Sequence, residues 1–426
     1  MEFIITVIFV LGFLAIAMEH SIKINKASSA LVTGVLCWTI YIINAGDHHL
    51  VTHELMEHVS EIASILFFLL GAMTIVELID AHDGFEIILE KIHTLNKRKL
   101  LWIISLIAFF LSAVLDNLTT TIVMVSLVRK LISSKEDRLF FAGMIVIAAN
   151  AGGSWSPIGD VTTTMLWIGG QISAAGIVKS VLLPSLVCLI LPLLILGYYM
   201  KGDIQRVEDI KKDYIRRSTP FERNAVFFLG LFCLLFVPVF KTITHLPPFM
   251  GMMLGLGIMW IITEFIHHRK DEIDKDRFSV NYALRKIDTP SILFFLGILI
   301  SVAALQATGI LKNLAEWLTA TLKNDSAIVM SIGLLSSLVD NVPLVAAAQG
   351  MYPLTQYPAD HYFWHFLAYA TGTGGSALII GSAAGVAAMG LVKIDFIWYL
   401  KKITIWALVG YLAGAFAFIA LHSIFR

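Results

Sequence analysis

The sequence predicts an all-α polytopic membrane protein, built from two inverted repeats of about five spans, each with a re-entrant hairpin and a broken helix. Three observations lead to this fold class. The 426-residue chain is 58% hydrophobic and only 15% charged, with a mean hydropathy of +0.81. Several stretches of bilayer-spanning length contain no Asp, Glu, Lys or Arg. Three motifs also occur twice, in the same order.

The repeated motifs indicate an internal duplication. SILFFLLG at 64–71 returns as SILFFLG at 291–297, and Asp116–Asn117 returns as Asp340–Asn341. NAGGSWSPIGD at 150–160 returns as GTGGSALIIGS at 372–382, at nearly the same offset along the chain as the Asp–Asn pair. Nearly constant spacing of ordered motifs favours duplication over chance.

The expected spans follow this duplication. In the first half they cover 2–18, 28–45, 61–80, a polar-tipped stretch at 100–131, 139–170 and 177–199. In the second half they cover 222–240, 247–266, 289–306, a polar-tipped stretch at 326–349, 363–391 and 403–424. We expect a first repeat over 1–200, a charged cytoplasmic linker at 201–221 and a second repeat over 222–426.

The charges of the loops indicate how the polar-tipped stretches pass through the membrane. If 100–131 enters the membrane and turns back, nearly all loop lysines and arginines fall on one side. The opposite side then holds the loops 46–60 and 350–362, which contain neither. A double crossing fits the charges too, but the polar tip favours a re-entrant hairpin. The two SILFF helices are then an odd number of crossings apart, which makes the repeats inverted.

Charge and cysteine usage argue against other classes. Lys+Arg and Asp+Glu both number 31, so the formal net charge is zero and nothing suggests a nucleic-acid partner. The three cysteines lie in apolar runs and are expected to pack, not to form disulfides or a metal site. Phe3–Met18 lacks a basic n-region and a cleavage site, so it is expected to span the membrane.

A break in the helix is expected at 150–160. Gly152, Gly153, Pro157 and Gly159 interrupt an otherwise apolar stretch. Irregular backbone at membrane depth is tolerated only where it lines a cavity, and its free carbonyls and helix ends attract a small cation. The copy at 371–382 has the same glycine-rich character.

Oxygen-bearing side chains at the tips and breaks are the candidate ligands. Three intramembrane carboxylates, Asp116, Asp160 and Asp340, join amide and hydroxyl groups. The first break offers Asn150, Ser154, Thr162, Thr163 and Thr164, and the second offers Thr371, Thr373, Ser376 and Ser382, with Gly374 and Gly375 beside them. Hard oxygen ligands suit sodium or lithium, not zinc or copper. We expect the cation in the Asp116/Asn150/Asp160 region and no cofactor.

A buried carboxylate that binds a cation can bind a proton instead, because burial disfavours its charged form and a bound cation favours it. Competition at one carboxylate is the simplest chemistry for cation/proton exchange. A structural role stays open as well. Asp116 can cap the second hairpin arm with help from Thr119, and Asp160 can cap the helix from Val161 onward. Ionisable groups in spans are functional by default, and the duplication favours function.

The order SILFF, LDNLTTT, NAGGSWSPIGDVTTTMLW, VDNVPL and GTGGSALIIGSAAG resembles the NhaD-type sodium/proton antiporters of the ion transporter superfamily. The resemblance spans about residues 60–400. It implies an antiporter of the cell inner membrane that exchanges cytoplasmic sodium or lithium for external protons. It also implies a homodimer with a scaffold domain and a transport domain that moves as an elevator.

The resemblance also assigns the site by position. Its cation- and proton-binding set falls on Asp116, Asn117, Asn150, Asp160, Thr162, Thr163, Ser336, Asp340, Asn341 and Ser376. The supporting positions are Thr119, Gly152, Gly153, Ser154, Pro157, Thr371, Thr373, Gly374 and Gly375. The second half has Ser382 where the first has Asp160, so the two half-sites are not expected to be equivalent.

Three rival interpretations remain. A sodium-coupled anion (dicarboxylate-like) symporter of the same fold would have Ser-Asn-Thr triplets at its tips, whereas carboxylates there repel an anion. An intramembrane aspartyl protease needs Gly-x-Gly-Asp, whereas 156–160 reads SPIGD, and it leaves the duplication unexplained. A passive channel does not need titratable groups at closed tips. The sequence therefore predicts a coupled transporter and no enzyme.

Overall fold

The computed structural model describes residues 1–205, 218–268 and 270–424. Within these ranges every regular element is a helix and no strand occurs. Eight of the described helices are long and apolar enough to cross a membrane, or nine if a pair bent by 113° counts as one span. The chain is a multi-pass membrane protein, as its composition predicts. Most of the expected linker at 201–221 lies outside the described residues.

The described parts of the chain contain both long and short helices. The first half contains α1 (Glu2–Ala17), α2 (Glu19–Ile22), α3 (Lys26–Asn44), α4 (His48–Ala81), α5 (Glu86–Glu90), α6 (Lys97–Leu115), α7 (Asn117–Leu131), α8 (Lys135–Gly153), α9 (Val161–Ile168) and α10 (Ala174–Tyr199). The second half contains α11 (Pro220–Thr244), α12 (Pro248–His267), α13 (Glu272–Arg277), α14 (Val280–Lys286), α15 (Thr289–Ala307), α16 (Ile310–Leu322), α17 (Asp325–Leu335), α18 (Asn341–Met351), α19 (Tyr362–Gly374), α20 (Ala383–Val392), α21 (Phe396–Lys402) and α22 (Thr404–Ile424).

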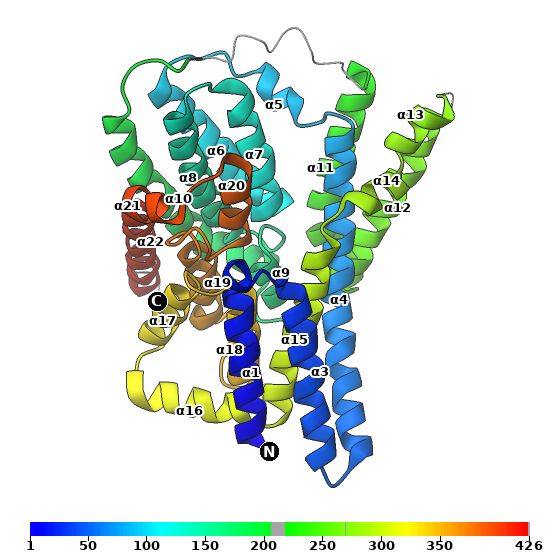
Figure 1. Ribbon diagram of the computed structural model, residues 1–426, viewed down its shortest axis with the longest axis vertical. Helices are drawn as coiled ribbons and strands as arrows, with labels where there is room; N and C mark the ends of the chain where they lie inside the picture. The colour runs from blue at the N-terminus through cyan, green and yellow to red at the C-terminus, as the bar shows by residue number, and fades with distance from the viewer. Residues whose placement is uncertain (206–217, 269, 425–426) are drawn as a thin grey trace.

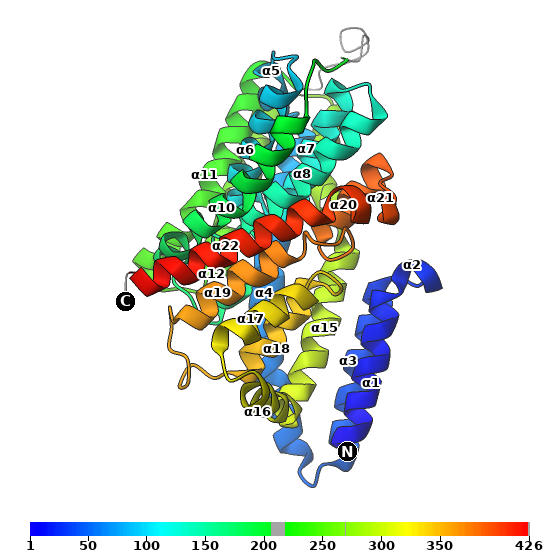
Figure 2. The ribbon, with the colours of Figure 1, turned by 90° about the vertical axis from the view of Figure 1, so that its left-hand side faces the viewer.

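The long helices form two groups (Figures 1 and 2). In the first group, α1, α3, α15 and α4 pack in succession, and α11 and α12 pack against α4. In the second group, α6 packs on α8, α17 on α19, and α10 on α22, and the shorter helices α7, α9, α18 and α20 pack against α8 or α19. The groups meet where α15 contacts α18 and where α4 contacts α9. The crosswise helix α16 contacts both α15 and the α17/α18 pair.

One expectation about a loop is wrong. The stretch 46–60 is not an external loop, because α4 already begins at His48 and continues to Ala81. The Asp47 side chain caps this helix by accepting from the backbone N–H groups of His49 (2.9 Å) and Leu50 (3.2 Å). Val51, 2% exposed, packs in a small apolar cluster with Trp38 of α3, so tertiary packing extends the helix.

Glycines allow backbone contact at matching places in the two halves. A Cβ on Gly152 of α8 would overlap the carbonyl oxygen of Phe109 in α6. A Cβ on Gly374 of α19 would likewise overlap the carbonyl oxygen of Gly333 in α17. The same close approach therefore recurs at the offset of the repeated motif, and only glycine permits it.

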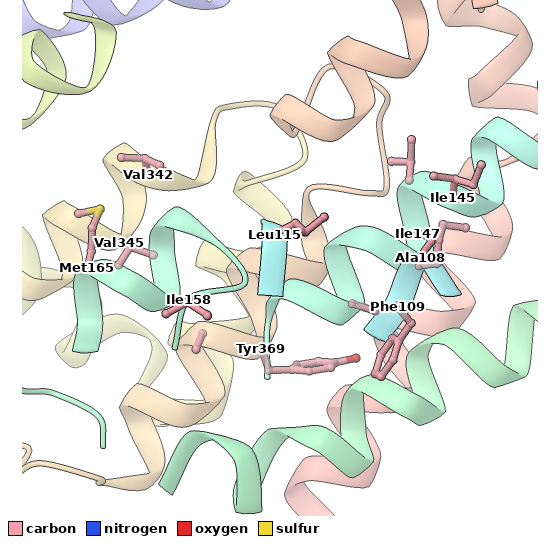
Figure 3. Close-up of a cluster of buried hydrophobic side chains, with 14 of the residues drawn as sticks. Ala108, Phe109, Leu115, Ile145, Ile147, Ile158, Met165, Val342, Val345 and Tyr369 are labelled. Atoms are coloured by element: carbon pink, nitrogen blue, oxygen red, sulfur yellow. The ribbon is translucent and has the colours of Figure 1, made fainter. Parts of the chain in front are cut away.

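Apolar side chains from both halves surround these contacts. Figure 3 shows side chains of α6, α8, α9, α18 and α19, and of the segment between α8 and α9, gathered in one cluster. Among them are Phe109, Leu115, Ile158, Met165, Val342, Val345 and Tyr369. All of these residues are at most 7% exposed. The core of the second group thus joins the two halves of the chain, which fixes their polar tips relative to each other.

The substitution Gly374→Ala should destabilise the protein by about 1–3 kcal/mol, because the added methyl group forces α19 away from α17. Thermal unfolding in detergent, followed by tryptophan fluorescence, measures the loss. Gly257→Ala in α12 is the matched control, since a Cβ there meets no atom within 4 Å. The control should be neutral or slightly stabilising. Equal melting temperatures for the two variants would contradict this packing.

Candidate functional site

Four interruptions of the chain meet in the second group. Asp116 alone separates α6 from α7, and residues 336–340 separate α17 from α18. Residues 154–160 lie between α8 and α9, and residues 375–382 lie between α19 and α20. Side-chain hydrogen bonds connect all four interruptions. Their local sequences, rich in Gly, Asn, Asp and Ser, explain why the helices stop there.

Asp160 is the centre of this network. Its Oδ2 accepts hydrogen bonds from the Asn117 Nδ2 and the Asn341 Nδ2, both at 3.2 Å. The carboxylate is 2% exposed and each asparagine is 5% exposed. The two asparagines are the repeated residues of the two Asp–Asn tips. One buried carboxylate therefore holds one tip from each half of the chain.

Asn150 extends the network to the second break. Its Oδ1 accepts from the Asn117 Nδ2 at 3.0 Å. Its Nδ2 donates to the hydroxyl oxygens of Ser376 and Ser382, both at 2.9 Å. The Asn150 side chain is completely buried. It thus connects the first tip with the second break.

The three carboxylates share one arrangement. In each, Oδ1 caps the following helix by accepting a backbone N–H, from Thr119 for Asp116 (2.8 Å), from Thr162 for Asp160 (3.2 Å) and from Val342 for Asp340 (3.3 Å). The capping role that the sequence left open is therefore real, but it uses only one of the two oxygens.

The second oxygens have different partners. The Asp116 Oδ2 accepts from the Thr119 hydroxyl at 2.9 Å, and the Asp340 Oδ2 accepts from the Lys26 Nζ at 3.3 Å. Asp116 also has a φ of 75°, a region that non-glycine residues rarely adopt and that is concentrated at functional sites. The Oδ1 atoms hold the carboxylates in place as helix caps. The Oδ2 atoms of Asp116 and Asp340 bond to side chains, which a cation or another donor can replace.

A cavity of about 50 Å³ lies among these groups, with Lys26, Asp116, Asp160 and Asp340 in its wall. A larger cavity of about 430 Å³ lies beside it, between α4, α7 and the start of α15. Leu118 and Thr119 line both cavities. The carboxylates that line the larger one are Glu77, Asp80, Asp83, Glu86 and Asp288. Thr119 therefore stands between an acidic vestibule and the three-carboxylate site.

Some predicted ligands bond to backbone instead. The Ser336 hydroxyl donates to the carbonyls of Gly333 and Thr371, which ties α17 to α19. The hydroxyls of Thr371 and Thr373 donate to carbonyls of their own helix, and that of Thr163 donates to the Asp160 carbonyl. These side chains support the breaks without reaching the carboxylates. The buried Thr162 hydroxyl, in contrast, has no hydrogen-bond partner within the described residues.

The remaining supporting positions shape the first break. The Ser154 hydroxyl donates to the Asn150 carbonyl at 2.7 Å, and the Pro157 carbonyl accepts from the Thr164 hydroxyl at 3.0 Å. A Cβ on Gly153 would overlap the Gly159 carbonyl oxygen. In the second break, a Cβ on Gly375 would lie 2.8 Å from the Gly381 carbonyl oxygen. Both breaks therefore fold back on themselves at a glycine.

Sequence patterns give little indication of two contacts in the site, those of Ser382 with Asn150 and of Lys26 with Asp340. Ser382 occupies the repeat position of Asp160, and that correspondence is the signal that points to it. Lys26 counts only among the loop charges in the sequence, because nothing near it shows that it meets Asp340 in the other half of the chain. Such a contact follows from the packing of α3 on α15 and of α15 on α18.

A family model and several known proteins match most of the chain. The citrate transporter family model, CitMHS, matches residues 5–366. "Sodium/proton antiporter 1" of Arabidopsis thaliana is 47% identical over 98% of this chain and 72% of its own, and "Sodium/proton antiporter 2" is 44% identical over 98% and 99%. The "Na(+)/H(+) antiporter NhaD" of Vibrio cholerae is 30% identical over 96% and 89%. The chain therefore belongs to the NhaD-type sodium/proton antiporters of the ion transporter superfamily, which are transporters and not enzymes.

Proposed function

We propose that this protein exchanges cytoplasmic sodium, or lithium, for external protons. We further propose that the metal cation and the proton compete for Asp160. The observation that carries the proposal is the contact of one buried carboxylate with an asparagine from each tip. A proton on Asp160 or a cation beside it would each neutralise this charge, and burial makes an uncompensated charge costly. The names of the Arabidopsis and Vibrio relatives support sodium and protons as the exchanged ions.

The asparagines suit both states of such a site. An asparagine amide carries two N–H donors and one carbonyl acceptor on the same end, so a half-turn exchanges one for the other. With N–H groups directed at Asp160, as here, they stabilise the ionised carboxylate without a metal ion. With the carbonyl oxygens turned inward, they would join the carboxylate and the buried Thr162 hydroxyl as sodium ligands.

The acidic vestibule supports access to the site from one side. Its wall contains Lys130 and Lys286, which lie on the side that the loop charges assign to the cytoplasm. Five carboxylates in the wall would raise the local concentration of cations. We infer an inward-facing state, in which sodium approaches through the vestibule and passes Thr119. Protons would then displace it after the site faces outward.

We propose that the chain consists of two inverted repeats, over 1–200 and 222–426, joined by a linker at 201–221. This arrangement would explain why Gly152 and Gly374 make matching contacts. Helix α17 has 11 residues, about 16 Å, which is too short for a hydrocarbon core of about 30 Å. This length supports a re-entrant hairpin in the second half. Helix α6 has 19 residues and is long enough to span, so the first hairpin depends on the repeat symmetry.

We further propose that the second helix group is the transport domain and the first group the scaffold of a homodimer in the cell inner membrane. All residues of the hydrogen-bond network around Asp160 belong to the second group, whereas Lys26 of the first group contacts it at Asp340. An elevator movement would carry the network as a unit past α4 and α15. Dimer, elevator and location come from the family resemblance and stay predictions.

A sodium-coupled anion symporter is the second candidate, because the matching family model is described as a citrate transporter. Three carboxylates in the wall of the small cavity oppose this candidate, since they repel a carboxylate substrate. Transport assays separate the two. An antiporter moves protons when sodium is added, whereas a symporter takes up labelled citrate or succinate with sodium.

Purified protein in liposomes with an internal pH dye should move protons when sodium or lithium is added, and Asp160→Asn should lose at least nine-tenths of this rate. Asparagine caps a helix as well as aspartate does, so the loss reports the missing charge and not a missing cap. Asp395→Asn is the matched control, because Asp395 caps α21 outside the site (Trp398 N–H, 3.0 Å). A fully active Asp160→Asn, or wild type that responds only to citrate, would refute the proposal.

Removal of one amide should weaken sodium binding. We expect Asn117→Ala to raise the apparent KM for sodium about tenfold, about 1.4 kcal/mol. Asn341→Ala should have a smaller effect, because Asn117 also donates to Asn150 whereas Asn341 donates to Asp160 alone in the described network. Initial rates against sodium concentration give the values, with the exposed Asn44→Ala as control. The reverse order of the two effects would contradict the assigned contacts.

A further inference from the structure

The contact between Lys26 and Asp340 joins the two helix groups at the wall of the site. Lys26 is the first residue of α3, and its Nζ lies 3.3 Å from the Asp340 Oδ2. The two side chains are 26% and 15% exposed, so the pair is partly shielded from solvent. The Asp340 Oδ1 already caps α18, and Oδ2 is the oxygen that remains for a cation. Lys26 contacts that oxygen.

The fold holds Lys26 in this place. Its backbone N–H donates to the Glu19 carboxylate at 3.1 Å, and the Asn25 side chain caps α3 by accepting from the Ala27 N–H at 2.9 Å. The Lys26 ammonium also lies 4.3 Å from the ring centroid of Phe294, a completely buried residue of the second SILFF motif. The lysine is therefore directed into the site by contacts on both its backbone and its side chain.

A lysine ammonium resembles sodium in the property that matters here. It is a compact, strongly hydrated single charge on a flexible stem, and it seeks the same carboxylate oxygens. Four charged residues line the small cavity: Lys26, Asp116, Asp160 and Asp340. With all four ionised, the lysine cancels one of three negative charges, and it does so at Asp340.

We propose that Lys26 is a built-in counter-ion that competes with the transported cation. Its ammonium occupies the Asp340 Oδ2 while the site is without sodium, and sodium must displace it before Asp340 can contribute to binding. This inference rests on the proposed exchange of sodium for protons. Lys26 thereby sets the sodium concentration at which the transporter works. The pair also breaks whenever the second helix group moves past α3.

The test compares Lys26→Met with Lys26→Arg in the liposome assay, at an alkaline pH where proton competition is weak. Lys26→Met should lower the apparent KM for sodium at least threefold, because the competitor is gone. Lys26→Arg should keep the KM at or above the wild-type value, because its guanidinium retains the charge and can reach the carboxylate. The exposed Lys23→Met removes a neighbouring charge and should change nothing.

A double-mutant cycle identifies the partner. In an Asp340→Asn background, Lys26→Met should no longer lower the KM, since the lysine acts through that carboxylate. An unchanged or higher KM in Lys26→Met, an Arg variant that behaves like Met, or an undiminished effect in Asp340→Asn would each overturn the inference. A wild type that moves no protons with sodium would instead refute the proposed function.

A measurement on the unaltered protein covers the case in which Lys26→Met does not fold. Lysines are acetylated with a small N-hydroxysuccinimide ester at fixed pH, in sodium chloride or in choline chloride, and the peptides are quantified by mass spectrometry. Sodium should increase the acetylation rate of Lys26 at least twofold and leave Lys23 unchanged. An equal or slower rate at Lys26, under conditions where sodium raises the melting temperature, would overturn the inference.

Discussion

The hydrogen bonds from Asn117 and Asn341 to the single Asp160 carboxylate are the constraint on which the rest of the site depends. A buried charge is tolerated only when donors or a cation compensate it, and here one donor comes from each half of the chain. The two tips must therefore meet at the first break. The glycine contacts of α8 with α6 and of α19 with α17 place them there.

This constraint also explains why the two halves differ. A second aspartate at the position of Ser382 would put two carboxylates close to Asn150, which already donates to that serine at 2.9 Å. A second asparagine at Gly372, the repeat position of Asn150, would not fit. Its Cβ would overlap the Ser154 hydroxyl and lie 3.6 Å from the Asp160 Oδ2. The two halves of the chain thus enclose one central carboxylate, and Asp116 and Asp340 line the same small cavity.

Local sequence predicted the features that depend on local chemistry. Apolar length identified the multi-pass membrane character and most of the long helices. Glycine and proline identified the breaks, and the repeated Asp–Asn pairs identified the asparagines that contact Asp160. Long-range packing determined what the sequence missed. Val51 extends α4 because it packs near Trp38. Ser336 bonds to the Thr371 carbonyl because two helices touch, and Lys26 reaches Asp340 through contacts between opposite halves of the chain. No periodicity or spacing in the chain contains that information.

The central claim is that sodium and protons compete for Asp160, and proton release upon sodium binding tests it most directly. Calorimetric titration of the detergent-solubilised protein with sodium, in buffers of different ionisation enthalpy, counts the protons released. At a pH at which Asp160 is mostly protonated before sodium is added, sodium should release a proton from the wild type. Asp160→Asn should release clearly fewer, whereas Asp395→Asn should match the wild type. Sodium binding without proton release, or equal release from Asp160→Asn, would contradict the account.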